Sequence, residues 1–170
     1  MFGFTRKTDY ALVALATLSG RLAAKDRPVS ARHVAQENGL PLPLLMQVLK
    51  DLHRAGILCS ARGAGGGYYL ADRPDQISLI RVIEAIEGPL HMAACCDDEA
   101  EAEPCVGCSL IQRCPITASM QRVNDTILEF LSRISVQHLI ESNTTAWPPL
   151  GGGHAGSFRS VSAMPEKELP

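Results

Sequence analysis

Five of the six cysteines of the chain lie within the segment CCDDEAEAEPCVGCSLIQRC, residues 95–114. Thiols at such short spacing can form disulfides, bind zinc, hold an iron–sulfur cluster or act as a redox switch. Cys105 and Cys108 form one C-x2-C pair, whereas structural zinc sites usually contain two such pairs, and the adjacent Cys95 and Cys96 cannot supply the second. From these residues alone, zinc and an iron–sulfur cluster are equally favoured.

The cellular compartment decides between disulfides and metal ligands. No run of about eighteen apolar residues is present, so we expect no membrane span. Asp9 interrupts the apolar N-terminal stretch and no A-x-A-like site follows it, which argues against a signal peptide. We therefore predict a cytoplasmic protein, in which clustered cysteines are more typical of metal binding than of disulfides.

Two helices are predicted on either side of the cysteine segment. Residues 79–87 form a short helix that Ser78 caps and that Gly88 and Pro89 end. After the segment, Pro115 opens a long helix with apolar residues at alternating steps of four and three, namely Ile116, Met120, Val123, Ile127, Phe130 and Ile134. This heptad pattern predicts pairing with the same helix of a second copy, and the alternative is packing onto its own domain.

The N-terminal half has the element order of a winged helix-turn-helix. Helices are predicted at residues 6–19, 31–38 and 43–55, followed by strands ILCSA and GYYLA with the glycine-rich RGAGG between them. Residues 1–71 hold nine Lys/Arg against four Asp/Glu, a balance of +5, whereas residues 72–141 hold five against twelve, a balance of −7. The basic half therefore favours an anionic partner.

The third helix has two chemically different faces. Leu45, Val48, Leu49 and Leu52 follow the i, i+3, i+4, i+7 pattern of a core contact. The opposite face consists of Pro43, Gln47, Lys50 and Arg54. It can contact DNA bases and phosphates, and Arg32 of the preceding helix is a further candidate for such contacts. An ordinary solvated helix face is the alternative, and the element order and the basic charge favour DNA.

The glycine-rich turn predicts a wing that reaches the DNA backbone. Gly65 and Gly66 suit a tight tip pressed against a sugar–phosphate wall, and Arg62 at its start can reach a phosphate or a minor groove. A nucleotide-binding loop is the alternative, but here the glycines lead into a strand rather than into a helix N-terminus. An enzyme is not expected either, because no nucleophile–base pair is arranged and the five histidines are scattered.

Together these segments resemble the Rrf-two family of winged-helix transcription regulators over residues 4 to about 141. The resemblance rests on TDYA near the start, on SARHVAQENGLPLPLLMQVLKDLHRAGIL, on RGAGGGYYLA, and on ISLIRVIEAIEGP followed by the cysteines. Regulators of iron–sulfur assembly operons look most similar. The resemblance implies a mainly α fold with a small β-wing, a winged helix-turn-helix and a long C-terminal dimerisation helix. It also implies a homodimer that binds a double-stranded DNA operator and represses such genes.

The resemblance further implies a 2Fe-2S or 4Fe-4S cluster held by three cysteines and a variable fourth ligand. Cys108 and Cys114 match the last two ligand positions, Cys96 or Cys95 competes for the first, and Cys105 is a candidate fourth. Asp9 occupies the position of a partner-subunit ligand in some relatives, and its alternative role is a helix N-terminal acid. A zinc or thiol switch without a cluster is the second choice.

Three regions are predicted. Residues 1–74 are expected to form the DNA-binding domain, and residues 75–141 the cysteine loop and the dimerisation helix. Residues 142–170, rich in Pro, Gly and Ser, are expected to be disordered.

Overall fold

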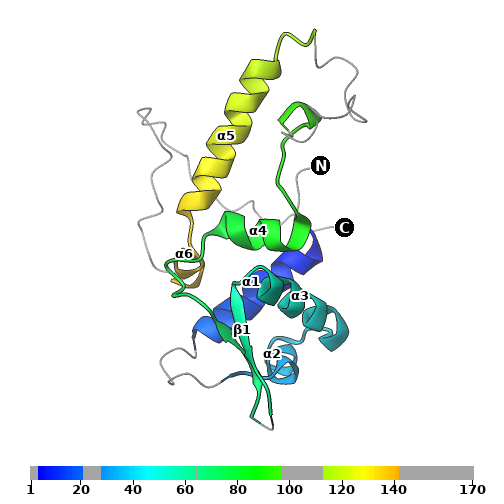
Figure 1. Ribbon diagram of the computed structural model, residues 1–170, viewed down its shortest axis with the longest axis vertical. Helices are drawn as coiled ribbons and strands as arrows, with labels where there is room; N and C mark the ends of the chain where they lie inside the picture. Colours follow the sequence, from blue (N-terminus) through cyan, green and yellow to red (C-terminus); the bar gives the residue numbers. More distant parts are fainter. Residues whose placement is uncertain (1–3, 21–27, 64, 97–112, 142–170) are drawn as a thin grey trace, which may run out of the picture.

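The computed structural model describes residues 4–20, 28–63, 65–96 and 113–141. The elements follow in the order α1 (Arg6–Ser19), α2 (Ala31–Asn38), α3 (Leu42–Arg54), β1 (Leu58–Ala61), β2 (Gly67–Leu70), α4 (Leu79–Glu87), the 3-10 turn η2 (Ala94–Cys96), α5 (Thr117–Arg133) and α6 (Val136–Ile140). Figure 1 shows the wing at one end of the molecule, α4 across its middle, and α5 extending away on the other side of α4. The predicted mainly α fold with a small β-wing is confirmed.

Local capping explains where most helices begin and end. The hydroxyl of Ser30 accepts from the backbone N–H of His33 at the start of α2, and Ser78 caps α4 in the same way. Gly39 ends α2 in the left-handed conformation, with φ of 63°, which glycine adopts without a steric penalty. These signals lie within a few residues of each boundary, so the sequence prediction for α2 and α4 is confirmed.

The main core lies between α1, α3 and the wing. Leu15 of α1, Leu49 of α3 and Leu58 of β1 are almost fully buried in it. The same cluster includes Ile77 from the loop before α4, Val82 from α4 and Val136 from α6. Residues on both sides of position 74 therefore share one core, although the division into two regions at that position stays a prediction.

A second, smaller cluster seats the base of α5 on α4. It joins Leu79 and Ile83 to Leu131 and Ile134. The backbone N–H of Leu79 donates to the carbonyl of Ile134 at 2.7 Å, next to an antiparallel bridge between residues 78 and 135. The end of α5 is thereby fixed to α4.

This arrangement corrects part of the prediction for the long helix. The helix begins at Thr117, two residues after Pro115, and ends at Arg133. The C-terminal part of the apolar stripe packs within the chain, with Ile127 and Phe130 against the second cluster and Ile134 3% exposed. Among the described residues, the N-terminal part of the stripe lacks such cover, since Ile116 is 56% and Val123 45% exposed. The predicted disordered tail, residues 142–170, lies outside the described residues.

Candidate nucleic-acid interface and cysteine site

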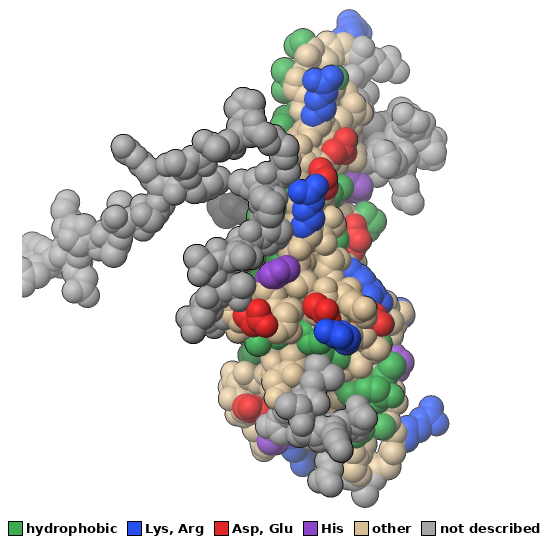
Figure 2. Space-filling view, turned by 90° about the vertical axis from the view of Figure 1, so that its left-hand side faces the viewer, with side chains coloured by type: hydrophobic (Ala, Val, Ile, Leu, Met, Phe, Trp, Pro, Cys, Tyr) green, Lys and Arg blue, Asp and Glu red, His purple; other side chains and the backbone are tan. Residues whose placement is uncertain are grey.

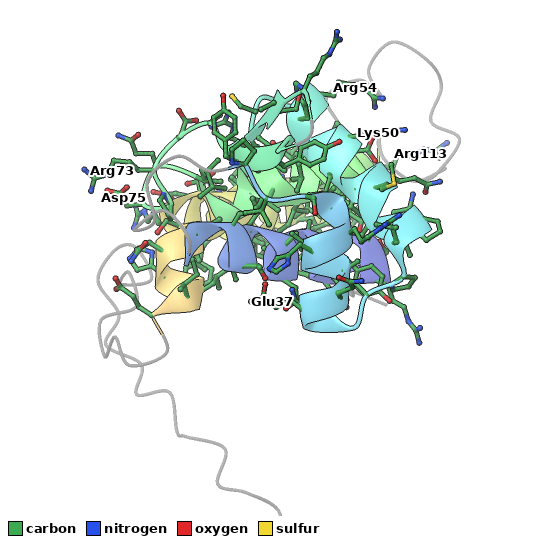
Figure 3. All side chains as sticks on the ribbon, turned by 90° about the horizontal axis from the view of Figure 1, so that it is seen from below. Glu37, Lys50, Arg54, Arg73, Asp75 and Arg113 are labelled. Atoms are coloured by element: carbon green, nitrogen blue, oxygen red, sulfur yellow. The ribbon has the colours of Figure 1, made fainter. Side chains whose placement is uncertain are left out.

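The α3 helix separates an apolar face from a polar one, as the sequence predicts. Its inner residues Leu45, Val48, Leu49 and Leu52 are all 0% exposed. The side chains of its outer face are all exposed, and they are Pro43, Gln47, Lys50 and Arg54. Figure 3 shows Lys50 and Arg54 projecting away from the body of the molecule, while Glu37 of α2 lies at a different edge. The outer face therefore offers an amide and two cations to a ligand that docks along α3.

Arg54 of this face already has a partner, and a further cation, Arg32, lies on the neighbouring helix. Arg54 forms an ion pair with Asp51, with 3.0 Å between Nη1 and Oδ1, but its side chain is 80% exposed. An exposed pair of this kind contributes about 0–1 kcal/mol, so a phosphate can replace Asp51 at little cost. Arg32 is exposed on α2, which precedes α3 in the helix-turn-helix.

Met46 belongs to the same outer face and was not predicted as a contact. It is 40% exposed, although methionine is among the residue types most often buried. It lies three residues after Pro43 and four before Lys50, at the edge of the outer face that borders the buried Leu49. An exposed thioether at this place offers an apolar contact to a thymine methyl group. Its helical spacing from Pro43 and Lys50 is the sequence signal that could have indicated it.

The wing is an antiparallel hairpin anchored to the segment before α2. Leu58 pairs with Leu70 and Ala61 with Gly67. Val29 and Tyr68 exchange two backbone hydrogen bonds of 2.9 Å and so form an isolated antiparallel β-bridge beside the hairpin. A Cβ atom at Gly67 would lie 2.3 Å from the carbonyl oxygen of Val29, so this close approach requires glycine.

The glycines at the wing tip have different physical roles. A Cβ atom at Gly66 would lie 2.4 Å from the carbonyl oxygen of Ala61, so the hairpin itself requires this glycine. Gly65 is exposed, and apart from its chain neighbours no described residue has an atom within 4 Å of its Cβ position, so its surface is open to an external ligand. Arg62 at the start of the turn is also exposed. The packing of the hairpin therefore explains the glycine at position 66 without DNA, whereas the described contacts give no such explanation for Gly65.

His53 connects the exposed end of α3 to the wing. Its Nε2 lies 2.9 Å from the hydroxyl oxygen of Ser60 on β1. Its ring also meets the ring of Tyr68 on β2 edge to face, with 6.4 Å between the centroids. These contacts join the outer face of α3 and the wing into one continuous surface. No sequence pattern indicated these contacts.

The first two cysteines of the cluster lie against α5. Cys95 is half-buried and Cys96 is 8% exposed, both in the turn η2. The side-chain amide of Gln121 donates to the carbonyl of Cys95 at 3.4 Å. The buried Asn124 accepts from the backbone N–H of Met92 through Oδ1 at 3.1 Å. The α5 helix therefore holds the front of the cysteine segment through its own polar side chains.

The other cysteines are only partly described. Cys114 is half-buried, directly before α5, where its carbonyl accepts from the backbone N–H of Thr117. Cys105 and Cys108 lie outside the described residues. Within the described ranges, no three Cys, His, Asp or Glu side chains are grouped closely enough to hold a metal ion. The complete ligand set therefore stays a prediction.

The described thiols offer soft sulfur ligands of the kind that iron and zinc bind. Burial raises the pKa of the Cys96 thiol, and its hydrogen bond with Cys95 raises it further. A neutral thiol is thus favoured there, but a coordinated iron or zinc ion deprotonates its thiol ligand outright. Asp9 is exposed in the first turn of α1, and within the described chain its carboxylate forms no hydrogen bond or ion pair. It is thus accessible to an external ligand.

Comparison with known proteins places this architecture among transcription regulators. Residues 4–142 match the Rrf2 family, described as an iron-dependent transcriptional regulator. The chain is 32% identical over 139 residues to the HTH-type transcriptional regulator IscR of Aliivibrio salmonicida, covering 82% of this chain and 77% of that protein. No described helix is long and apolar enough to cross a membrane.

Solved structures agree with the sequence match. The global cysteine regulator CymR of B. subtilis superimposes with a TM-score of 0.59 at 26% identity, covering 83% of this chain and 98% of that one. The structure of T. potens IscR gives a TM-score of 0.58 at 26% identity, covering 82% and 87%. These relatives are regulators of transcription rather than enzymes.

Proposed function

Because this chain belongs to the Rrf2 family of transcription regulators, we propose that it binds a DNA operator as a homodimer whose affinity depends on an iron–sulfur cluster. The observation that carries the DNA part is the division of α3. Its inner face is fully buried, and its outer face, continuous with the wing through His53, presents Gln47, Lys50 and the exposed Met46. A face of this composition suits insertion into a major groove.

Dimerisation is supported by the part of α5 that the described residues of its own chain leave uncovered. Ile116 and Val123 are exposed there, and a shallow hollow beside them is lined by Arg122, Val123, Thr126 and Ile127. Figure 2 shows hydrophobic side chains at the surface near the outer end of α5. Pairing of two such helices covers these side chains and sets the distance between the two α3 helices, which must match half-sites about 34 Å apart or a multiple of that.

The cysteine segment is the proposed sensor. Cys108 and Cys114 are the proposed paired ligands, Cys96 or Cys95 the first, and Cys105 or the partner subunit's Asp9 the fourth. When bound, a cluster would supply sensitivity to iron, oxygen or nitric oxide, because its assembly needs iron and because oxygen and nitric oxide degrade it. The residues of this chain then transmit the change, since η2 contacts α5 and the base of α5 is fixed to α4. The target genes are those of iron–sulfur assembly, repressed while the cluster is present.

The test combines metal analysis with DNA binding. After anaerobic purification we expect iron and acid-labile sulfide, and operator affinity higher by about fivefold to 150-fold in the loaded form, which corresponds to a typical coupling of 1–3 kcal/mol. The double variant Cys108→Ala, Cys114→Ala should lose both the cluster and this difference. Cys59→Ala is the matched control, because Cys59 lies in β1 of the wing. A colourless protein that holds one zinc per chain would refute the cluster.

A thiol switch of the same fold is the second candidate. Cys95 and Cys96 are adjacent free thiols in the turn η2, and this arrangement favours it. In that case operator affinity should follow treatment with peroxide or dithiothreitol in the complete absence of iron. The Cys108→Ala, Cys114→Ala variant should then still respond, provided Cys95 and Cys96 are present.

A further inference from the structure

Two of the motifs that mark the family resemblance contact each other, although about 80 residues separate them. The TDYA motif begins at Thr8 in the first turn of α1, and the EGP motif begins at Glu87, the last residue of α4. Oε1 of Glu87 accepts from the hydroxyl of Thr8 at 2.5 Å and from the hydroxyl of Thr5 at 2.6 Å. It also accepts from the backbone N–H of Thr5 at 3.1 Å. We call these three residues the Thr5–Thr8–Glu87 cluster.

The cluster is built around the N-cap of α1. The hydroxyl of Thr5 caps the helix by accepting from the backbone N–H of Lys7 at 3.3 Å, and it donates its proton to Glu87. Thr8 is 0% exposed, so its hydroxyl depends on this carboxylate, because a buried donor without a partner costs about 1–3 kcal/mol. Glu87 therefore fixes the orientation of the whole first turn of α1.

The Thr5–Thr8–Glu87 cluster lies between the start of the cysteine segment and the turn that carries Asp9. Directly after Glu87 come Gly88, whose φ of 85° suits glycine, and the segment that leads to Cys95 and Cys96. On the other side, Asp9 follows Thr8 and is exposed. One carboxylate thus joins the beginning of the cysteine segment to the turn that carries Asp9 and to the helix α1 that packs on α3.

We propose that Glu87 is a positioning residue that couples the cysteine segment to α1, and through α1 to the DNA-binding helix α3. This inference rests on the proposed function, since it specifies how the sensor reaches the DNA face. When the cysteine segment changes its arrangement, the end of α4 moves with it, and the three hydrogen bonds pass that movement to the first turn of α1. The same turn presents Asp9, so the Thr5–Thr8–Glu87 cluster also sets the position of the Asp9 carboxylate.

The first test measures coupling rather than stability. Operator affinity is measured for the full-length protein, with and without the reconstituted cluster, on a duplex selected by the wild-type protein from a random library. In Glu87→Ala the loaded-to-unloaded ratio of affinities should fall to within about twofold of one, from at least the fivefold that is typical of allosteric coupling. The affinity of the unloaded form should change by less than about twofold, because α3 itself is untouched.

Conservative and control variants separate positioning from folding. Glu87→Gln keeps an acceptor oxygen and should restore part of the ratio. Thr8→Val removes one hydrogen bond at nearly constant volume, and serves if Glu87→Ala does not fold. Glu84→Ala is the matched control on the same helix, because within the described chain the exposed Glu84 side chain forms no hydrogen bond or ion pair. It should leave the ratio unchanged.

Hydrogen exchange distinguishes failure of this inference from failure of the proposed function. In Glu87→Ala, amides of residues 5–9 and 88–92 should exchange faster together, at least severalfold, while those of α2 keep their rates. This readout needs no metal. Unchanged exchange at residues 5–9, or a wild-type ratio in Glu87→Ala, overturns the inference while the proposed function stands. If the wild-type ratio itself is one, the proposed sensor fails, and the coupling role fails with it.

Discussion

Met46 is a single residue whose exposure predicts a specific base contact. It lies on the outer face of α3 between residues that can bind phosphates and base edges. We expect Met46→Ala to weaken operator binding roughly fourfold, because burial of one methylene-sized contact contributes about 0.8 kcal/mol. Replacing the contacted thymine by uracil should cost the wild-type protein as much and the variant nothing. Binding titrations with thymine-to-uracil duplexes test this.

Lys50→Ala provides the contrast for that experiment. As a phosphate contact it should weaken binding to the thymine and uracil duplexes equally, and it should lower the salt dependence. If every single uracil substitution affects Met46→Ala and the wild-type protein alike, Met46 does not contact a thymine methyl.

Glu87 makes the stability of the fold depend on pH. Partial burial raises the pKa of Glu87, but the hydrogen bonds from Thr5 and Thr8 and the charge of Lys7 outweigh it, and the pKa lies below its ordinary value. Its contribution to stability is therefore fully present above the unfolded-state pKa, about 4.3, and is lost as the pH falls through the folded-state pKa. Urea unfolding of wild type and Glu87→Gln should differ at pH 7, and the difference should shrink below about pH 4. A constant difference would contradict this account.

The wing as an element depends on one close approach of two backbones. In Gly67→Ala the new methyl group would collide with the carbonyl of Val29, 2.3 Å away. We expect a loss of roughly 1–3 kcal/mol in the free energy of unfolding, which is typical of overpacking at a rigid site. Operator affinity should fall as well, because the two hydrogen bonds between Val29 and Tyr68 hold the wing beside α2. Chemical denaturation and DNA titration measure the two effects.

Gly65→Ala is the matched control in the same hairpin. Apart from its chain neighbours, no atom of the described residues lies within 4 Å of its Cβ position, so the free energy of unfolding should stay within about 0.5 kcal/mol of wild type. Weaker DNA binding by this variant at unchanged stability would place the wing tip against the DNA. Equal destabilisation by both substitutions would refute the role assigned to Val29.

The outer end of α5 is proposed to determine the oligomeric state of the whole molecule. We expect Val123→Glu to shift the protein toward monomer, because it places a charge in the exposed apolar stripe that a second copy is proposed to cover. Operator affinity should fall with it, since two half-sites can then no longer be bound together. Sedimentation equilibrium over a concentration series measures the mass.

Ala118→Glu is the control for this charge. Residue 118 is exposed and lies about 140° around α5 from Val123, at 100° per residue. It should leave the mass unchanged. A dimer that persists in Val123→Glu, or one lost equally in both variants, would move the interface away from this stripe.

At the scale of the whole molecule, the sequence determined the features that depend on neighbouring residues. The bounds of α2 and α4 follow from Ser30, Gly39 and Ser78, which act within one turn of each boundary. The two faces of α3 follow from helical periodicity, because burial of Leu49 and exposure of Lys50 need no knowledge of distant residues. The family is likewise legible in the sequence, since its motifs occur in order.

Only the tertiary structure decided what depends on contacts between distant segments. The sequence could not show that Glu87 holds Thr5 and Thr8, because hydrogen-bond partners about 80 residues apart leave no periodic signal. For the same reason, the apolar stripe of α5 read as one seam, whereas Leu79 and Ile83 cover its C-terminal part and leave Val123 exposed. Local patterns indicate which side chains are core candidates by their apolar spacing. The packing of the whole chain determines which other element buries them.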